Sequence, residues 1–348
     1  MRDAMTPMWR SAFAPRPAVV ALAVLYVCAA PSAWPRDGAR IAFGGVTADF
    51  AVGIYVTSPE GRVFEELTEH GGHASGPAWS HDGRTIAFSD TFDGLGSRIH
   101  VMDRDGRDVR EVSNAPPLSG DYVPAWSPRD DAIAFTSSRE GHFRQGIYVT
   151  DLDGRETRIT ALDTFAKWPS WGSTGGAIAY ASSHAGFLNI HVMDDEGRRQ
   201  GQLTDRRRLD MFPSWHARGT AIVFASGTVE DRIGDGDIYV IAANGTGEQR
   251  LTAHPADDGD PSWSPDGAKI VFTSRRDGNG LYIMDRDGRN IRRVTDGGEF
   301  RGIEGSSWYD PDAPRSVSPV ARRATMWGWL RAVDARAHRA EALRSRRP

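Results

Sequence analysis

One short sequence pattern recurs along this chain and constrains its fold more than any other feature. WSPDGAKIVF at residue 263 has close counterparts in WPRDGARIAF at 34 and WSHDGRTIAF at 79. Looser copies are WSPRDDAIAF at 126, WGSTGGAIAY at 171 and WHARGTAIVF at 215, and a seventh Trp opens WYDPDAP at 308 without the apolar run. Successive Trp residues are 44 to 48 positions apart, so one structural unit is repeated along the chain.

Each period continues in the same order after the apolar run. A second apolar stretch follows, such as IYV at 54 or LYI at 281, and then often an acidic turn with Gly, such as DRDG at 103. A short segment then ends in a pair such as Leu251-Thr252. Four short antiparallel strands per period are typical of a β-propeller blade. Six copies of each strand type predict an all-β, six-bladed propeller of four-stranded antiparallel blades.

The surplus Trp predicts how the ring closes. There are seven Trp segments but six apolar runs, and little chain precedes the first run once a leader is removed. We therefore expect Ile303 to Trp308 to form the innermost strand of the first blade and to pair with residues 41–44. The blade tryptophans are predicted to be structural, packed between blades. They are Trp79, Trp126, Trp171, Trp215, Trp263 and Trp308.

The N-terminal segment has the layout of a secretory signal peptide. Arg2, Arg10 and Arg16 precede an apolar run over residues 18–30, and small residues follow at 29–33. We predict a signal peptide at 1–33 and an exported protein, periplasmic or extracellular; an uncleaved membrane anchor is the alternative. Cys28, the single cysteine, lies in this run, so the mature chain would contain no disulfide.

The predicted propeller, residues 34–310, is acidic, and the tail, residues 311–348, is rich in Arg. The whole chain carries −4, residues 1–33 carry +2 and residues 315–348 carry +7, which leaves −13 for residues 34–314. A helical tail would contact an anionic membrane or a cell-wall polymer; folding back onto the acidic disc and disorder are the alternatives. No nucleic-acid partner is expected for an acidic, exported body.

These repeats resemble the WD40-like PD40 repeats of the TolB family, a family of periplasmic propellers. The resemblance is carried by Pro261-Ser262-Trp263-Ser264-Pro265-Asp266-Gly267 and by IHVMDRDG at 99–106, and it extends over about residues 34 to 310. It implies a propeller and an envelope partner. TolB is expected to carry an additional N-terminal domain, whereas the first blade here follows the predicted signal peptide directly, so we expect a TolB-like propeller with its own partner.

The motifs of common catalytic and metal sites are missing from the sequence. It contains no G-x-S-x-G, no H-E-x-x-H and no cysteine pair. His70 and His73 form HGGH without an apparent third ligand. An EF-hand alignment of the D-x-D-G turns would place Val101 and Val112 at ligand positions, so calcium is not expected there. We predict no catalytic residue, no metal and no cofactor, and we expect the turn Asp side chains to cap backbone N–H groups.

A binding surface is predicted from topology. The SPDG and DxDG turns must share one face of the disc, and the longer links, including residues 226–237, must share the other, where binding is expected. Residues just before the blade tryptophans are predicted to border the central channel and to hold a peptide, a sugar or a cation, with a water-filled pore as the alternative. They are Asp121, Tyr122, Lys167, Trp168, Asp210, Phe212, Asp258, Asp260, Arg301 and Glu304.

Two functions follow from these features. The preferred one is a monomeric, exported scaffold that binds an envelope protein or peptide and has no catalytic role. The alternative is an enzyme or a ligand-binding protein that uses the acidic channel, acting on a glycan or peptide with a divalent cation.

Overall fold

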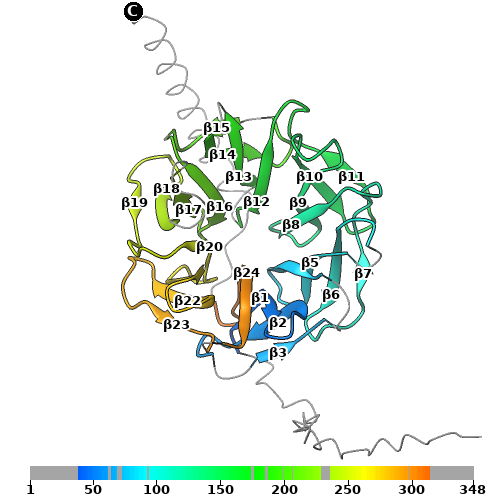
Figure 1. Ribbon diagram of the computed structural model, residues 1–348. Helices are drawn as coiled ribbons and strands as arrows, with labels where there is room; N and C mark the ends of the chain where they lie inside the picture. The colour runs from blue at the N-terminus through cyan, green and yellow to red at the C-terminus, as the bar shows by residue number, and fades with distance from the viewer. Residues whose placement is uncertain are drawn as a thin grey trace, which may run out of the picture. The chain divides into compact units, whose positions relative to one another are not determined.

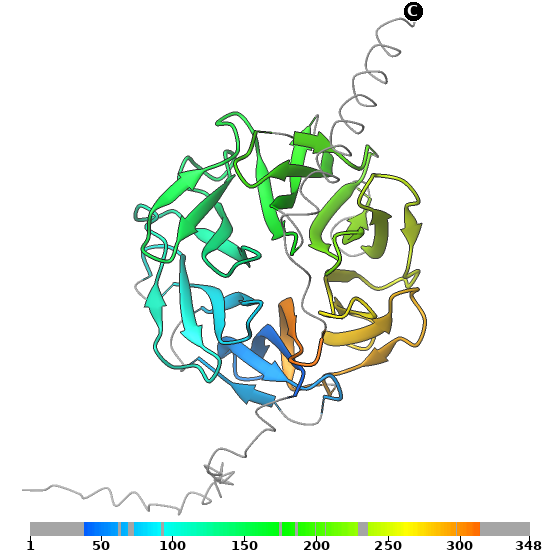
Figure 2. The same cartoon turned by 180° about the vertical axis from the view of Figure 1, so that it is seen from behind.

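The structure is a computed structural model that describes residues 38–313, apart from 62–63, 69–72, 92–93, 174–175, 185–186, 199, 206, 229–235 and 297. All regular structure in these residues is β, in 24 strands arranged as a ring (Figures 1 and 2). The predicted signal peptide and the tail beyond residue 313 lie outside the described residues. In the part of the chain that is described, we find no helix with the length and hydrophobicity needed to span a bilayer.

The strands form six meanders, each running from the centre of the ring to its rim. The first contains β24 (Phe300–Tyr309), β1 (Arg40–Thr47), β2 (Val52–Thr57) and β3 (Phe64–Glu66). The second contains β4 (Ser75–Trp79), β5 (Thr85–Asp90), β6 (Arg98–Asp103) and β7 (Arg110–Glu111). The third contains β8 (Asp121–Trp126), β9 (Ala132–Ser137), β10 (Gly146–Asp151) and β11 (Glu156–Arg158).

The remaining three meanders complete the ring in the same order. The fourth contains β12 (Ala166–Trp171), β13 (Ala177–His184), β14 (Phe187–Asp194) and β15 (Gln200–Gln202). The fifth contains β16 (Leu209–Trp215), β17 (Ala221–Gly227), β18 (Asp237–Ala242) and β19 (Gln249–Arg250). The sixth contains β20 (Asp258–Trp263), β21 (Lys269–Ser274), β22 (Gly280–Asp285) and β23 (Arg292–Arg293).

The prediction of six separate blades needs a correction. Four meanders are separate four-stranded sheets, whereas β12–β15 and β16–β19 belong to one eight-stranded sheet. A single parallel bridge between Leu188 of β14 and Leu209 of β16 joins its two halves. Strands β13 and β14 are eight residues long, two more than their counterparts β9 and β10, so their shared end reaches the first residue of β16. The chain is therefore an all-β propeller with four separate blades and one fused pair.

The predicted ring closure is confirmed. Strand β24 pairs antiparallel with β1, with Trp308 opposite Ile41 and Ile303 opposite Gly45. The two ends of the described chain thus complete one sheet, and no inner strand of the described ring is left without its partner.

The recurring sequence pattern is explained by two repeated contacts. The aromatic residue that ends each apolar run lies directly opposite the aromatic residue of the next strand, as in Phe272 and Tyr282, whose ring centroids are 5.8 Å apart. The Thr or Ser that ends each period accepts the backbone N–H at the start of the third strand, as when Thr295 Oγ1 accepts the N–H of Leu281 at 3.0 Å. Both contacts occur in all six meanders, so the repeat encodes hydrogen bonding as well as packing.

The blade tryptophans occupy the interfaces that the sequence predicts. Trp79, Trp126, Trp215 and Trp263 are buried, and each belongs to a cluster that includes strands of the preceding meander. Trp171 and Trp308 are partly buried against equivalent clusters.

The acidic turns also behave as predicted. Oδ1 of Asp103 accepts the backbone N–H groups of Asp105 and Arg107 at 2.9 and 2.8 Å. Asp151 makes the same pair of contacts in the third meander. Side chains that cap their own turn in this way need no bound cation.

Chain direction defines two faces. The SPDG turns after the inner strands and the DxDG turns before the outer strands lie together on one side, which we call the turn face. The loops between second and third strands and the links between meanders lie on the other side, the link face. In the predicted link-face loop 226–237, residues 229–235 lie outside the described residues.

Candidate functional site: the central channel and the link face

The six inner strands share one irregularity. Each has a β-bulge before its Trp, and the residue three positions before that Trp has a positive φ of 46° to 57°. These residues are Gly76, Val123, Trp168, Phe212, Asp260 and Gly305. A positive φ is costly for any residue except Gly, and most of all for a β-branched residue such as Val123. Hydrogen bonds from neighbouring sheets support it: Ser89 Oγ accepts the N–H of Val123 at 3.1 Å, and Thr136 Oγ1 accepts that of Trp168 at 2.9 Å.

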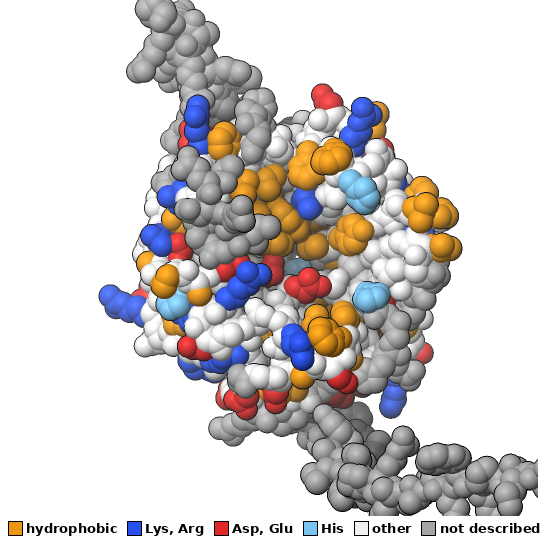
Figure 3. All heavy atoms as spheres, in the orientation of Figure 1, with side chains coloured by type: hydrophobic (Ala, Val, Ile, Leu, Met, Phe, Trp, Pro, Cys, Tyr) orange, Lys and Arg blue, Asp and Glu red, His pale blue; other side chains and the backbone are white. Residues whose placement is uncertain are grey.

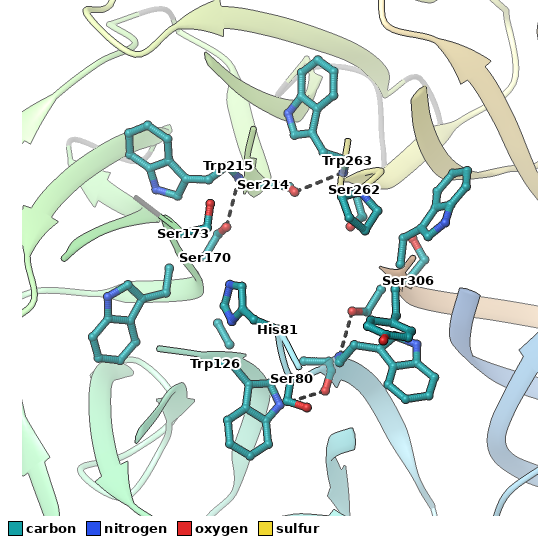
Figure 4. Close-up of a pocket in the computed structure, with 18 of the residues that line it drawn as sticks. Ser80, His81, Trp126, Ser170, Ser173, Ser214, Trp215, Ser262, Trp263 and Ser306 are labelled. Atoms are coloured by element: carbon teal, nitrogen blue, oxygen red, sulfur yellow. Dashed lines mark hydrogen bonds between the residues drawn. The ribbon is translucent and has the colours of Figure 1, made fainter. Parts of the chain in front are cut away.

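A cavity of ≈ 510 Å³ occupies the centre of the ring (Figure 4). Its walls are the bulged residues, the prolines that follow them, the blade tryptophans and the SPDG turns, so it opens on the turn face. Figure 4 shows the indoles of Trp126, Trp215 and Trp263 around its edge and the imidazole of His81 pointing toward its centre. Of the ten predicted channel residues, Trp168, Phe212 and Asp260 line this cavity.

Serine hydroxyls connect the inner strands around the cavity. Ser307 Oγ accepts the backbone N–H of Trp79 at 2.9 Å, and Ser170 Oγ accepts that of Trp215 at 3.1 Å. Ser214 Oγ does the same for Trp263 at 3.4 Å. These bonds join successive meanders, so the wall of the cavity is a rigid frame.

The mouth of the cavity holds an acidic group that the sequence analysis did not single out. Asp130 accepts hydrogen bonds from the backbone N–H groups of His81 and Asp82 and lies 3.0 Å from Nδ1 of His81. Burial alone would raise the pKa of Asp130, but these hydrogen bonds outweigh it and lower the pKa. Both residues lie in turns that were interpreted from their sequence as hairpins alone, which is why the position went unnoticed.

Two aromatic side chains and one carboxylate face the channel from successive inner strands. The rings of Trp168 and Phe212 pack against each other with centroids 4.3 Å apart. Oδ2 of Asp260 accepts the backbone N–H of Gly305 at 3.4 Å. Burial raises the pKa of Asp260 to about 7; the Gly305 N–H opposes this, and the carboxylates of Glu304 and Asp257 add to it. The side chain is partly open to water in the channel, but protein surrounds it on its other sides.

Three other predicted residues lie four positions before the blade tryptophans, one residue nearer the link face than the bulged residues. They are Lys167, Tyr122 and Glu304. The ammonium of Lys167 lies 4.6 Å from the ring centroid of Trp168, and burial lowers its pKa. Burial also raises the pKa of Glu304, against a hydrogen bond with Ser75. Tyr122 is 36% exposed. Figure 3 shows a hollow at the centre of the ring, with hydrophobic and acidic side chains at its margin.

Three of the predicted rim carboxylates are buried, which corrects their expected placement. Asp121, Asp210 and Asp258 are 0%, 2% and 0% exposed. Arg139 pairs with Asp121 at 3.1 Å, Arg276 pairs with Asp258 at 2.7 Å, and Ser226 Oγ donates to Asp210 at 2.7 Å. The bulge reverses the alternation of side chains along each inner strand. The side chains of the three aspartates therefore point toward partners within their own meanders and away from the channel. Arg301, the remaining predicted residue, is exposed and lies 4.2 Å over the ring of Phe50.

The link face presents apolar side chains that the sequence analysis did not single out. Five large apolar side chains in its loops and links are 48% to 93% exposed: Phe50, Leu95, Leu118, Phe143 and Leu162. The backbone N–H of Leu118 donates to the carbonyl of Leu95 at 2.5 Å, so those two leucines are neighbours. On the turn face, the corresponding exposed side chain among the described residues is Val109, at 44%. Irregular loops carry no periodic signal, so a single sequence does not reveal such residues.

The described residues contain no group of three or more His, Asp or Glu side chains placed to hold a metal ion. Of the HGGH motif, His70 lies outside the described residues. The backbone N–H of His73 donates to Oδ1 of Asp90 at 2.7 Å.

Comparison with known proteins gives one family. The model of the TolB beta propeller domain matches residues 18–231 and 227–312. A TolB homolog of Chlorobium luteolum is 31% identical over 128 residues, which cover 37% of this chain and 28% of that protein. The Tol-Pal system protein TolB of Desulfosudis oleivorans is 30% identical over 124 residues, covering 35% and 27%. The matched stretch thus spans less than a third of either relative's length.

The same fold is present in a solved structure. The crystal structure of TolB from Acinetobacter baumannii matches with a TM-score of 0.65 at 21% identity, covering 78% of this chain and 66% of that one. At this identity the likeness establishes the fold alone.

Proposed function

Because this chain belongs to the family of TolB β-propeller domains, we propose that it is an exported, non-catalytic scaffold of the cell envelope that binds a protein or peptide on its link face. The name of one relative, a Tol-Pal system protein, supports an envelope partner. The lack of catalytic motifs in the sequence supports a binding role.

The observation that carries this proposal is the backbone geometry of two exposed link-face residues. Phe50 and Leu118 are 69% and 83% exposed, and both have positive φ, 68° and 65°. A large apolar side chain in this conformation is strained, and its exposure adds an unfavourable contact with water. Neither feature helps the isolated chain fold, whereas both present an apolar side chain to a partner. Exposed apolar groups gathered on one face are typical of protein interaction sites.

The test compares the two faces. Phe50→Asn and Leu118→Asn remove the apolar side chains, and Asn tolerates a positive φ, so both variants are expected to fold. Val109→Asn is the matched control on the turn face. Each tagged full-length variant is used to capture partners from envelope extract. A protein or peptide bound by the wild type and by Val109→Asn, but lost with the two link-face variants, is the expected result. Equal binding by all variants, or no bound protein or peptide, contradicts the proposal.

Export is tested separately. We expect the chain recovered from the periplasmic or extracellular fraction to have lost the segment 1–33, which its mass measures directly. Recovery of the full-length chain in the membrane fraction would favour an anchored protein instead.

A further inference from the structure

Two titratable side chains of opposite sign lie on opposite sides of the channel. Lys167 and Glu304 occupy the same position in their inner strands, four residues before Trp171 and Trp308. Their strands, β12 and β24, are separated by two other inner strands in either direction around the ring. In a ring of six inner strands such positions face each other across the axis, and β12 and β24 are seen on opposite sides of the centre in Figure 1.

Lys167 has no acidic partner among the residues that the structure describes. Its recorded contacts are with two aromatic rings, at 4.6 Å from Trp168 and 5.8 Å from Phe165. Burial is the sole cause of its lowered pKa, with no carboxylate acting against it. The other lysine, Lys269, has an ordinary surface pair with Asp285 at 2.8 Å.

Asp260 and Glu304 likewise have no basic partner in the described part of the chain. Asp260 receives one long backbone hydrogen bond, from Gly305, and Glu304 one from the side chain of Ser75. The fold does pair other buried carboxylates, as Arg139 and Arg276 show for Asp121 and Asp258. Lys167, Asp260 and Glu304 are thus left without a partner of opposite charge in the described part of the chain, and all three lie on inner strands.

Charges held away from water without a partner are unfavourable, and they are retained most readily where a ligand supplies the missing charge. The channel contains two carboxylates on adjacent strands and an ammonium on the far side. We infer that the channel binds a small zwitterion, with its cationic group beside Asp260 and Glu304 and its anionic group beside Lys167. This ligand would be additional to the protein partner proposed above, and the inference does not depend on that partner.

The wall between the charged groups suits the body of such a ligand. The positions equivalent to Lys167 and Glu304 in the other inner strands are uncharged: Ser75, Tyr122, Met211 and Gly259. The packed rings of Trp168 and Phe212 supply an apolar surface on the side of Lys167. A flexible chain of methylene groups between an ammonium and a carboxylate matches this order of surfaces.

The chain's two lysines make a direct test possible. Reductive methylation with ¹³C labels Lys167, Lys269 and the N-terminal amine and preserves their charge, and each of these amines gives its own NMR signal. The probes are the unbranched ω-amino acids from glycine to 6-aminohexanoate, added to the full-length protein. We expect a saturable shift of the Lys167 signal for at least one probe, with the Lys269 signal unchanged. That probe should bind about tenfold more tightly than butylamine or butyrate.

Glu304→Gln provides the decisive variant because it lies across the channel from the label. If one ligand spans the channel, this substitution should weaken the shift at Lys167 by about tenfold in affinity. Glu111→Gln, on the outer strand β7, is the matched control and should leave the binding curve unchanged. The inference is overturned if no probe shifts the Lys167 signal. It is also overturned if butyrate alone binds as well as the zwitterions, or if Glu304→Gln binds as the wild type does.

Discussion

The guanidinium of Arg139 lies 3.1 Å from Oδ2 of Asp121, a carboxylate with no exposed surface. Burial raises the pKa of Asp121, and a hydrogen bond from Ser137 and the charge of Arg139 act against this. Arg139 also pairs with Glu156 and lies 4.2 Å over the ring of Tyr148. One side chain from the loop after β9 thus joins the innermost and outermost strands of the third meander.

Removing this guanidinium should be strongly destabilising. Arg139→Met leaves Asp121 buried without its charge partner, and we expect unfolding free energy to fall by about 3–5 kcal/mol in urea titrations. Arg129→Met breaks an exposed pair with Asp131 and should cost no more than about 1 kcal/mol. Adding Asp121→Asn to Arg139→Met should recover part of the loss. Equal effects of the two Arg substitutions would contradict the role given to the buried pair.

The hydroxyl at the end of each period should be required for its hydrogen bond. Thr160 Oγ1 accepts the N–H of Ile147 at 3.0 Å in a buried position. Thr160→Val keeps the shape but leaves this N–H unpaired, so a loss of about 1–3 kcal/mol is expected. Thr160→Ser keeps the hydroxyl and should lose less. Thermal unfolding of the two variants measures the difference; a Val variant as stable as the Ser variant would show that the hydroxyl is dispensable.

Two glycines at matching turn positions should differ in their response to substitution. Gly154 and Gly197 have similar φ values, 82° and 72°. A Cβ on Gly154 would meet no atom within 4 Å, whereas one on Gly197 would overlap the carbonyl oxygen of Ile159. Gly154→Ala should therefore cost about 1–2 kcal/mol, for the left-handed backbone alone. Gly197→Ala should cost clearly more in the same urea titration, and equal costs would rule out the steric explanation.

Stability should decrease as the pH rises from about 4 toward neutrality because of Asp260. Its pKa is raised from 3.8 to about 7 in the folded protein, so the folded chain holds this proton more tightly than the unfolded chain does. The contribution of Asp260 to the free energy of unfolding is fully present below pH 3.8 and is lost as the pH rises through about 7. Glu304 and Asp257 face the same carboxylate, and the pKa of Glu304 is raised in the same sense.

The pH effect is measured by urea midpoints at pH 5 and pH 8. Asp260→Asn stays uncharged at both values, so the difference between its midpoints should be smaller than that of the wild type. Glu304→Gln in addition should reduce it further. An unchanged difference in Asp260→Asn would show that this carboxylate does not titrate near neutrality.

The sequence predicted the fold well because the repeated residues mark strand pairing and hydrogen bonds to the backbone, which recur in every period. The pairing of residues 303–308 with the strand at 41–44 followed from counting Trp segments, and the capping role of Asp103 and Asp151 followed from their turn motif. The bridge between Leu188 and Leu209 was not predictable in this way, because it depends on strand length at one end of β14.

The placement of the channel residues was predicted less well, for a specific reason. Periodicity locates a residue along a strand, but the bulge decides which way its side chain points. A Pro follows the bulged residue in five of the six inner strands, but this repeated Pro was not interpreted as the mark of a bulge. A signal was available for the buried aspartates. Arg139 and Arg276 both lie six residues after the Ile that opens the apolar run, in the same meanders as Asp121 and Asp258. This shared pattern identifies them as pairs within a sheet.

The pairing of β24 with β1 sets an order of events as well as a shape. These two strands are separated by almost the whole described chain, so their contact has the longest loop to close and the slowest expected formation. A chain that is synthesised from its N-terminus exposes the edge of β1 until its last strand has emerged. Until then the first meander has only three strands, and the free edge of β1 can pair with another chain. If the protein is exported as proposed, it is best kept unfolded until β24 can follow β1 across the membrane.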